Sequence, residues 1–195
     1  SGTEYAKQDF ETVTAKQDIA LEGWKNLDLI GSKKWIGKSY NGNSYAEISA
    51  YNASATVDSW LISPAVTIDS ESATITFDIV FGHYKGDCFD ILVSDNYNGG
   101  DEIDPTKWTS LKDKFTYPEP LTSGYTALTN VGKASLASYK GKTVYFAFHY
   151  SGNPTDKTTT IQIDNFAVSS TVLSKTNEKP YSALYKFNGT SWSLN

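Results

Sequence analysis

Apolar and polar residues alternate along several stretches of this chain, whereas helical periodicity is scarce. In the segment 72–81, Ile75, Phe77 and Ile79 fall on one face, and threonines and an aspartate fall on the other. A period of two is that of a strand with one face turned toward a core. The same pattern predicts further strands over residues 89–93, 142–150 and 158–168, and weaker ones over 8–13, 33–36, 44–50 and 59–62.

Signals for helices are few and short. Asp104 followed by Pro105 predicts the start of one helical turn, since Asp caps helix N-termini and Pro fits the first position. A second turn is predicted within residues 134–139. Many short strands without crossover helices are typical of an antiparallel sandwich or barrel. We therefore predict an all-β, antiparallel β-sandwich over residues 1–170.

The C-terminal segment has a different pattern. Residues 171–180 are polar and predict a linker. Beyond them, Asn188-Gly189 separates two alternating runs, which is a strong signal for a β-hairpin over residues 181–195. Two strands alone are marginally stable in water. We therefore expect this hairpin to pack on the main domain, the alternative being a partner outside this chain.

Composition and charge exclude some classes of function. The 195 residues carry a net charge of −5, and every basic side chain is a lysine. Because nucleic-acid-binding proteins use arginine forks on a basic face, this class is excluded. The single cysteine, Cys88, rules out an internal disulfide or a cysteine-based zinc cluster and is interpreted as a buried apolar residue. No segment reaches the length of apolar residues that a membrane helix needs.

Catalytic motifs are poorly represented. The two histidines, His83 and His149, lie in or beside predicted strands, and the chain has no Gly-x-Ser-x-Gly turn or phosphate-binding loop. A pair of carboxylates for glycoside hydrolysis stays open, because a sequence does not give their separation. Glu47 is the strand acid to consider, with a solvent-facing structural role as the alternative. We predict that the protein is not an enzyme.

Two acidic segments are candidates for calcium. The loop 95–104 lacks the ligand spacing of an EF-hand and is interpreted as a solvated turn, with an irregular calcium loop as the alternative. Glu11 lies in the first predicted strand and Asp164 in the last strong one. First and last strands of a sandwich often pair, and two facing carboxylates require a cation, a shared proton or intervening water. The alternative is that both are unrelated surface acids.

Five segments of the chain recur together in a known type of domain: 9–11, 60–68, 89–99, 139–148 and 161–166. The Leu-Ile-Ser-Pro and Ile-Asp-Asn elements within them are together fairly specific. In their order and spacing these segments resemble the choice-of-anchor J and cleaved-adhesin domains over roughly residues 8 to 170. The loop that leads to Trp108 is particularly similar to DUF5017, a Bacteroidetes surface-lipoprotein family of unknown function.

The resemblance implies a jelly-roll sandwich like that of MAM domains and carbohydrate-binding modules. It also implies export and attachment to the cell surface through a lipid anchor, which this chain does not include; we expect that targeting information precedes Ser1. Family members often hold a structural calcium ion, and Glu11 and Asp164 occupy the matching positions, with Asp9 as a weaker third. Residues 21–26 depart from the Asp- and Gly-rich run of cleaved adhesins, so further ligands are unidentified.

The leading hypothesis is therefore a non-catalytic surface module that binds a glycan, with calcium as a structural cofactor. Aromatic residues make up 14% of the chain, and exposed rings stack on sugar faces. The rivals are a module that adheres to a surface protein and, third, a glycan-active enzyme. For each candidate tyrosine the alternative is a packing role. Those in predicted loops are Tyr40, Tyr84, Tyr97, Tyr117 and Tyr125.

Overall fold

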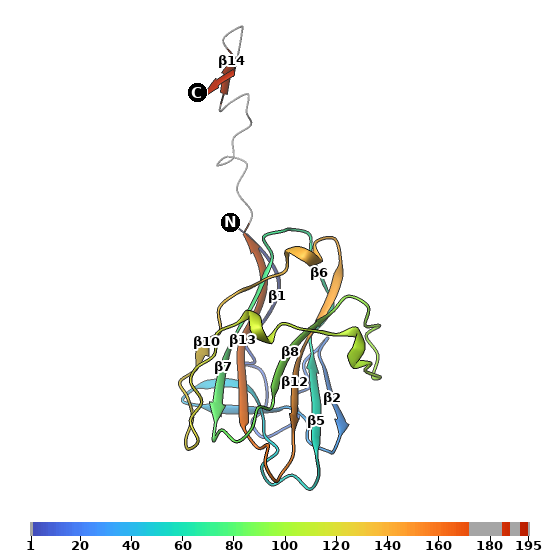
Figure 1. Cartoon of the computed structure of the whole chain (residues 1–195), viewed down its shortest axis with the longest axis vertical. Coiled ribbons are helices and arrows are strands. Elements are labelled where there is room, and N and C mark those ends of the chain that lie inside the picture. The colour runs from blue at the N-terminus through green and yellow to red at the C-terminus, as the bar shows by residue number, and fades with distance from the viewer. Residues whose placement is uncertain (1, 172–184, 188–191, 195) are drawn as a thin grey trace.

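The computed structural model describes residues 2–171 together with two short strands at 185–187 and 192–194. Two antiparallel sheets face each other as a β-sandwich, which is visible in Figure 1. The first sheet has the strand order β10-β7-β13-β4-β3, with β1 also paired to β13 and β11 to β7. Its strands are β1 (Gly2–Gln8), β3 (Ile36–Tyr40), β4 (Asn43–Ile48), β7 (Thr74–Gly82), β10 (Thr129–Asn130), β11 (Ala134–Ser135) and β13 (Thr160–Thr171).

The second sheet covers the other side of the core. Its strand order is β2-β5-β12-β8-β9, and β6 pairs with the first residues of β12. Three single-turn 3-10 helices interrupt the loops of the described chain, at Pro105–Lys107, Lys112–Lys114 and Ala137–Tyr139. The strands are β2 (Lys25–Ile30), β5 (Val57–Ile62), β6 (Val66–Thr67), β8 (Phe89–Ser94), β9 (Thr109–Ser110) and β12 (Thr143–Gly152).

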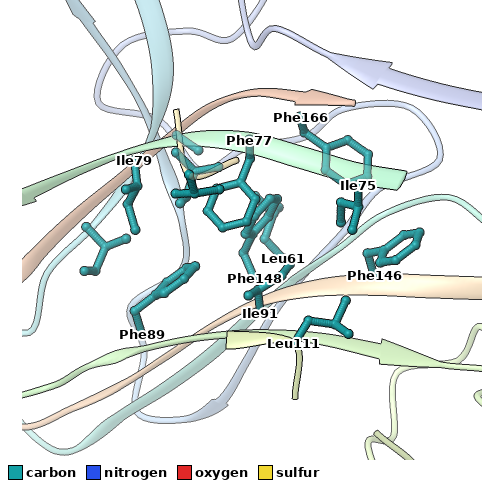
Figure 2. Packing of buried hydrophobic residues seen from close by; sticks show 14 of the residues in the cluster. Leu61, Ile75, Phe77, Ile79, Phe89, Ile91, Leu111, Phe146, Phe148 and Phe166 are labelled. Carbon is teal, nitrogen blue, oxygen red and sulfur yellow. The ribbon is translucent and has the colours of Figure 1, made fainter. Parts of the chain in front are cut away.

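The core between the sheets is rich in phenylalanine. Phe77 of β7 lies with its ring centroid 5.2 Å from that of Phe148 in β12 and 5.0 Å from that of Phe115. Figure 2 shows the rings of Phe77 and Phe148 among branched aliphatic side chains from both sheets. Cys88 is buried among them, as predicted. Such cross-sheet ring contacts fix how the two layers sit against each other.

Six of the eight predicted strands agree with observed ones to within three residues at each end. The strand predicted over 33–36 shares only Ile36 with β3, and two further differences matter. The first strand is Gly2–Gln8, so Asp9 and Glu11 lie in the turn that follows it and not within it. The edge strand β2 has no counterpart among the predicted strands. Its residues are intermediate or exposed throughout, so neither face shows the period-two contrast that marks the inner strands.

The predicted pairing of first and last strands is confirmed. β1 runs antiparallel to β13, with Gln8 opposite Phe166. The capped turn is also present, because Asp104 accepts a hydrogen bond from the backbone N–H of Thr106 at 3.0 Å. Among the described residues, none of the helices has the length and apolar character needed to cross a membrane.

At the C-terminus, the two predicted hairpin strands pair with each other. β14 (Tyr185–Phe187) and β15 (Trp192–Leu194) are antiparallel, with Phe187 opposite Trp192. The predicted linker, 171–180, lies outside the described residues except for its first position. The packing of the hairpin on the main domain stays a prediction.

Candidate functional site

A groove runs across the outer face of the seven-stranded sheet. Alternation along β4 turns Ala46 and Ile48 into the core, and it therefore turns Tyr45 and Glu47 outward. The antiparallel register then sets Gln162 of β13 directly opposite Glu47 on one side and opposite Val80 of β7 on the other. These outward residues form the floor of the groove.

The groove consists of two hollows that meet in the middle. The first has a volume of about 700 Å³ and the second about 860 Å³, which is the size range of small-molecule sites. Both are lined by Glu47 and Tyr125, so the two hollows adjoin each other. We call this pair of hollows the outer groove.

The loop after residue 120 forms one wall of the outer groove. The backbone N–H of His83 donates to Gly124 at 2.8 Å, and that of Thr126 donates to Phe81 at 2.9 Å. These bonds continue the edge of β7 and place the Tyr125 ring over Gly82, where a Cβ atom would overlap it. His83 packs edge-on against the same ring, with centroids 5.1 Å apart. Gly82 thus leaves the space that Tyr125 occupies.

The exposed tyrosine rings gather at this groove. Within the described chain, Tyr40, Tyr51 and Tyr125 are the tyrosines with the most exposed side chains, at 70%, 66% and 51%. Tyr40 lines the first hollow, Tyr51 the second and Tyr125 both. A row of exposed rings beside a depression is an arrangement suited to stacking on flat ligand faces.

The floor carries a buried polar pair. Gln162 Nε2 donates to Glu47 Oε2 at 2.8 Å, and both residues are only 9% exposed. Lys38 Nζ lies 3.7 Å from the second oxygen of Glu47. Since each partner holds the other in one geometry, the pair presents fixed hydrogen-bonding groups to a ligand.

A lysine fixes the far end of the groove. Lys33 Nζ donates to the carbonyl oxygens of Ser49 and Tyr51 at 2.8 and 2.9 Å, which holds the chain just after β4. Burial lowers the pKa of Lys33, and the nearby charge of Glu47 acts against that shift. The position of Tyr51 is thereby set by a charge-assisted contact and not by the loop alone.

The structure separates the five candidate tyrosines. Tyr40, Tyr84 and Tyr125 line the outer groove. Tyr97 lies on the other sheet, 9% exposed, where its hydroxyl donates to Gly100 and burial raises its pKa to about 12. Tyr117 packs against Phe81 and Phe89 of the core, and burial raises its pKa as well. Tyr97 and Tyr117 therefore have the packing role that was the alternative for each candidate tyrosine.

Most groove residues have no counterpart among the predicted site residues. Among them are Tyr51, Tyr45 and Gln162, and a signal for the first two is present in the sequence. They lie in phase with Glu47 along one alternating run, so the outward face of β4 could have been taken as a single surface. Glu47 itself faces outward, as the strand pattern indicates, but its neighbours in the groove leave it only 9% exposed.

The two acids predicted to meet both reach the start of β4. Glu11 Oε2 accepts the backbone N–H of Ser44 at 3.0 Å, and Asp164 Oδ2 accepts from Asn43 Nδ2 at 2.8 Å. Asp164 is 1% exposed, and this burial raises its pKa; the charge of Glu11 adds to the rise, against the Asn43 hydrogen bond. Asp9 instead accepts the Glu11 N–H at 3.1 Å within the turn.

Backbone strain accompanies this acid pair. Phe10 and Asn165, the neighbours of Glu11 and Asp164, have φ angles of 56° and 49°. A bulky residue in the left-handed region is uncommon and persists where the surroundings enforce it. The β13 register also shifts between Asp164 and Ala167. The chain is thus bent so that two carboxylates approach the same place.

These residues fit an oxygen-ligated cation in part. Among residues 2–171, neither Glu11 nor Asp164 forms an ion pair with a lysine or histidine. Two carboxylates without a counter-charge are donors that calcium prefers. However, no cluster of three or more Asp, Glu, His or Cys side chains suited to a metal occurs in the described part of the chain. Backbone carbonyls or water would have to complete the coordination.

The two histidines lie apart from the acid pair. His149 Nε2 lies 2.7 Å from Asp58 Oδ1, and its ring packs on Trp60 with centroids 4.5 Å apart. Burial opposes ionisation of Asp58, but hydrogen bonds from His149 and Trp60 outweigh it and lower its pKa. This cluster stabilises the outer face of the six-stranded sheet. His83 lines the second hollow of the outer groove.

The architecture defines a jelly-roll β-sandwich of the cleaved-adhesin type. The K3 cleaved adhesin domain of Lys-gingipain from Porphyromonas gingivalis superposes with a TM-score of 0.62 at 18% identity, covering 88% of this chain and 100% of that domain. The K1 domain gives 0.58 at 16% identity, covering 86% and 98%, and the K2 domain gives 0.56 with the same identity and coverage. At these identities the likeness is one of fold.

The family follows from the sequence. The family model for DUF5017, a domain of unknown function, matches residues 65–188, and the chain belongs to this family. The predicted resemblance is therefore confirmed. None of the curated proteins matches the chain.

Proposed function

We propose that the protein is a non-catalytic cell-surface module that binds a glycan in the outer groove. The observation that carries this proposal is the gathering of Tyr40, Tyr51 and Tyr125 around a polar floor. Sugar rings offer an apolar C–H face for stacking and a hydroxyl rim for hydrogen bonds. The tyrosines match the first requirement, and Glu47 with Gln162 matches the second.

A binding role fits the groove better than hydrolysis does. Glycosidases place two carboxyl groups roughly 5–9.5 Å apart across the scissile bond. Among the described residues that line the two hollows, Glu47 is the one carboxylate, and it is already engaged by Gln162. The fold likeness to adhesin domains fits a surface location; lipid anchoring is the further proposal drawn from the family resemblance.

Calcium is proposed as a structural ion held by Glu11 and Asp164, which would neutralise the buried charge there. The acid pair contacts Asn43 and Ser44, at the start of the strand that forms the groove floor. An ion at this place would fix the hairpin that carries Tyr40. We therefore expect calcium to stabilise the fold and to leave the chemistry of the groove unchanged.

A glycan array on the whole chain, run in calcium and again in EDTA, tests the function. We expect one class of sugars to bind in calcium. Binding that is equal in EDTA would retain the module and leave calcium with a structural role or none. A blank array in both conditions would contradict glycan binding and leave a protein partner as the function, to be sought by pull-down.

Calcium and pH should act together on stability. Because the pKa of Asp164 is raised in the folded state, its protonated carboxyl favours folding. This contribution to stability is fully present below the unfolded-state pKa and is lost as pH rises through the folded-state pKa. Calcium binds the ionised form, so the stabilisation by calcium should grow from about pH 4, the ordinary pKa of an aspartate, to about pH 7. At one hundred times its dissociation constant the ion should add about 2.7 kcal/mol at neutral pH.

Thermal unfolding with and without calcium measures this effect. Glu11→Gln should abolish the response to calcium, whereas Glu22→Gln, at an exposed glutamate, should retain it. A calcium response that is the same at both pH values, or that survives Glu11→Gln, would contradict the assignment.

A further inference from the structure

Residues from alternate positions of a single strand line the outer groove in both hollows. Asn43, Tyr45, Glu47 and Ser49 point into it from alternate positions of β4 and its continuation. Six residue steps separate the first from the last, so at 3.4 Å per residue the row is about 20 Å long. A depression of this length suits a chain of rings better than one monosaccharide.

The exposed tyrosines are spread along this row. Tyr40 pairs with Asn43 in the β3–β4 hairpin and so lies at one end of the groove. Tyr51 follows Ser49 at the other end, and Tyr125 lines both hollows and so lies between them. Three separate stacking surfaces fit successive sugars of an extended chain.

The charge of the groove selects among such chains. Glu47 is largely buried, and its nearest cation, Lys38, lies at 3.7 Å, beyond a close hydrogen bond. Binding a carboxylate or sulfate against it would desolvate two like charges in one place. The chain as a whole carries −5 and contains no arginine. Lys38 lines the first hollow and Lys85 the second, so anionic glycans are disfavoured at the Glu47 subsite and, through the net charge of the chain, at long range.

We propose, on the basis of the glycan-binding function above, that the outer groove takes an internal stretch of a linear, uncharged polysaccharide, roughly four rings long. Tyr40, Tyr125 and Tyr51 stack on separate rings, and Glu47 with Gln162 accepts and donates hydrogen bonds at the central hydroxyls. The polymer enters at one end and leaves at the other, so its termini are not recognised.

Calorimetric titrations with cello-, xylo- and manno-oligosaccharides of roughly two to six rings test the length. For the series that binds, affinity should rise at least about tenfold from two rings to four and then change little. Reduction of the terminal sugar of the longest oligomer should leave its affinity unchanged. A dimer that binds as tightly as the hexamer would overturn the extended-chain inference while the proposed function stands.

Oligogalacturonides test the charge selection. Wild-type protein should bind them at least about tenfold more weakly than the uncharged series, and Glu47→Gln should narrow that gap. Gln keeps an oxygen for the Gln162 amide, so the fold should persist, which circular dichroism checks. Tight binding of oligogalacturonides by the wild-type protein would contradict the proposed preference for uncharged glycans. Failure of every oligosaccharide, charged or not, would overturn the glycan-binding function itself.

One end variant and a matched control separate the subsites. Tyr51→Ala should weaken hexamer binding several-fold and leave dimer binding unchanged, because a dimer can occupy the centre beside Tyr125. Ile30→Ala, an exposed apolar residue on the opposite sheet, is the matched control and should change neither. Equal losses for dimer and hexamer in Tyr51→Ala would contradict separate subsites.

Discussion

Replacing Tyr150 by Phe should destabilise the protein by about 2–4 kcal/mol, although only one oxygen atom is removed. The Tyr150 ring, in β12 of the second sheet, is fully buried. Its hydroxyl accepts the backbone N–H of Ala50 at 2.9 Å and donates to the carbonyl of Thr159 at 2.7 Å. Ala50 follows β4 and Thr159 directly precedes β13, so this hydroxyl is a buried polar tie between β12 of the second sheet and the chain beside two strands of the first.

The cost arises because the variant leaves two backbone groups buried without a partner. Ala50 and Thr159 are themselves completely buried, so water cannot replace the hydroxyl without a rearrangement. Burial also raises the pKa of Tyr150, which keeps the hydroxyl protonated and able to donate at all ordinary pH values.

Urea unfolding of wild type, Tyr150→Phe and Tyr117→Phe measures the effect. Tyr117 supplies the matched control, because its partly buried hydroxyl makes one bond, to the carbonyl of Lys112 at 2.9 Å. We expect the control to lose about 1 kcal/mol at an unchanged slope. Equal losses in the two variants would contradict the account of Tyr150 as a double tie.

The second large effect is expected at Gly82, where one added methyl group should weaken glycan binding at least about tenfold. A Cβ atom there overlaps the Tyr125 ring, so Gly82→Ala must push that ring from its place in the groove. No positive φ is involved at this glycine, and the substitution therefore adds no backbone strain. Stability should change much less than affinity.

A double-mutant cycle shows whether Gly82 acts through Tyr125. If it does, adding Gly82→Ala to a Tyr125→Ala background should cost little further affinity, since the displaced ring is already gone. Additive losses would indicate that Gly82 affects the groove in another way. Circular dichroism of each variant distinguishes a local effect from loss of the fold.

The inner strands were predictable from sequence because each has one buried face. The alternation of Ile75, Phe77 and Ile79 holds one strand in register with the core, and a shift by one residue would reverse it. β2 was not predictable, because an edge strand that is half exposed on both sides has no such contrast. The first strand was placed too late for a similar reason. The residues of β1 are intermediate or exposed throughout, and residues 9–13, where the strand was predicted, form an irregular turn.

The site was only partly predictable. Tyr40 and Tyr125 could be named because they lie in turn-rich segments, but Tyr97 and Tyr117 have the same local signal and pack inside. The groove depends on the register that sets Gln162 beside Glu47, and no local pattern contains that register. The pairing of first and last strands was predictable, but Glu11 reaches the start of β4, where Asp164 also lies, from the turn that follows β1.

The most direct test of the account is the affinity of wild type, Tyr125→Ala and Ile30→Ala for an oligosaccharide that binds on the array, measured by calorimetry. Tyr125 lines both hollows, whereas Ile30 lies on the opposite sheet with a similar exposure of 51%. If the outer groove is the binding site, Tyr125→Ala should bind the oligosaccharide at least about tenfold more weakly than wild type, and Ile30→Ala should bind it with the wild-type affinity. Equal affinities in all three proteins would contradict the claim that the outer groove is the binding site.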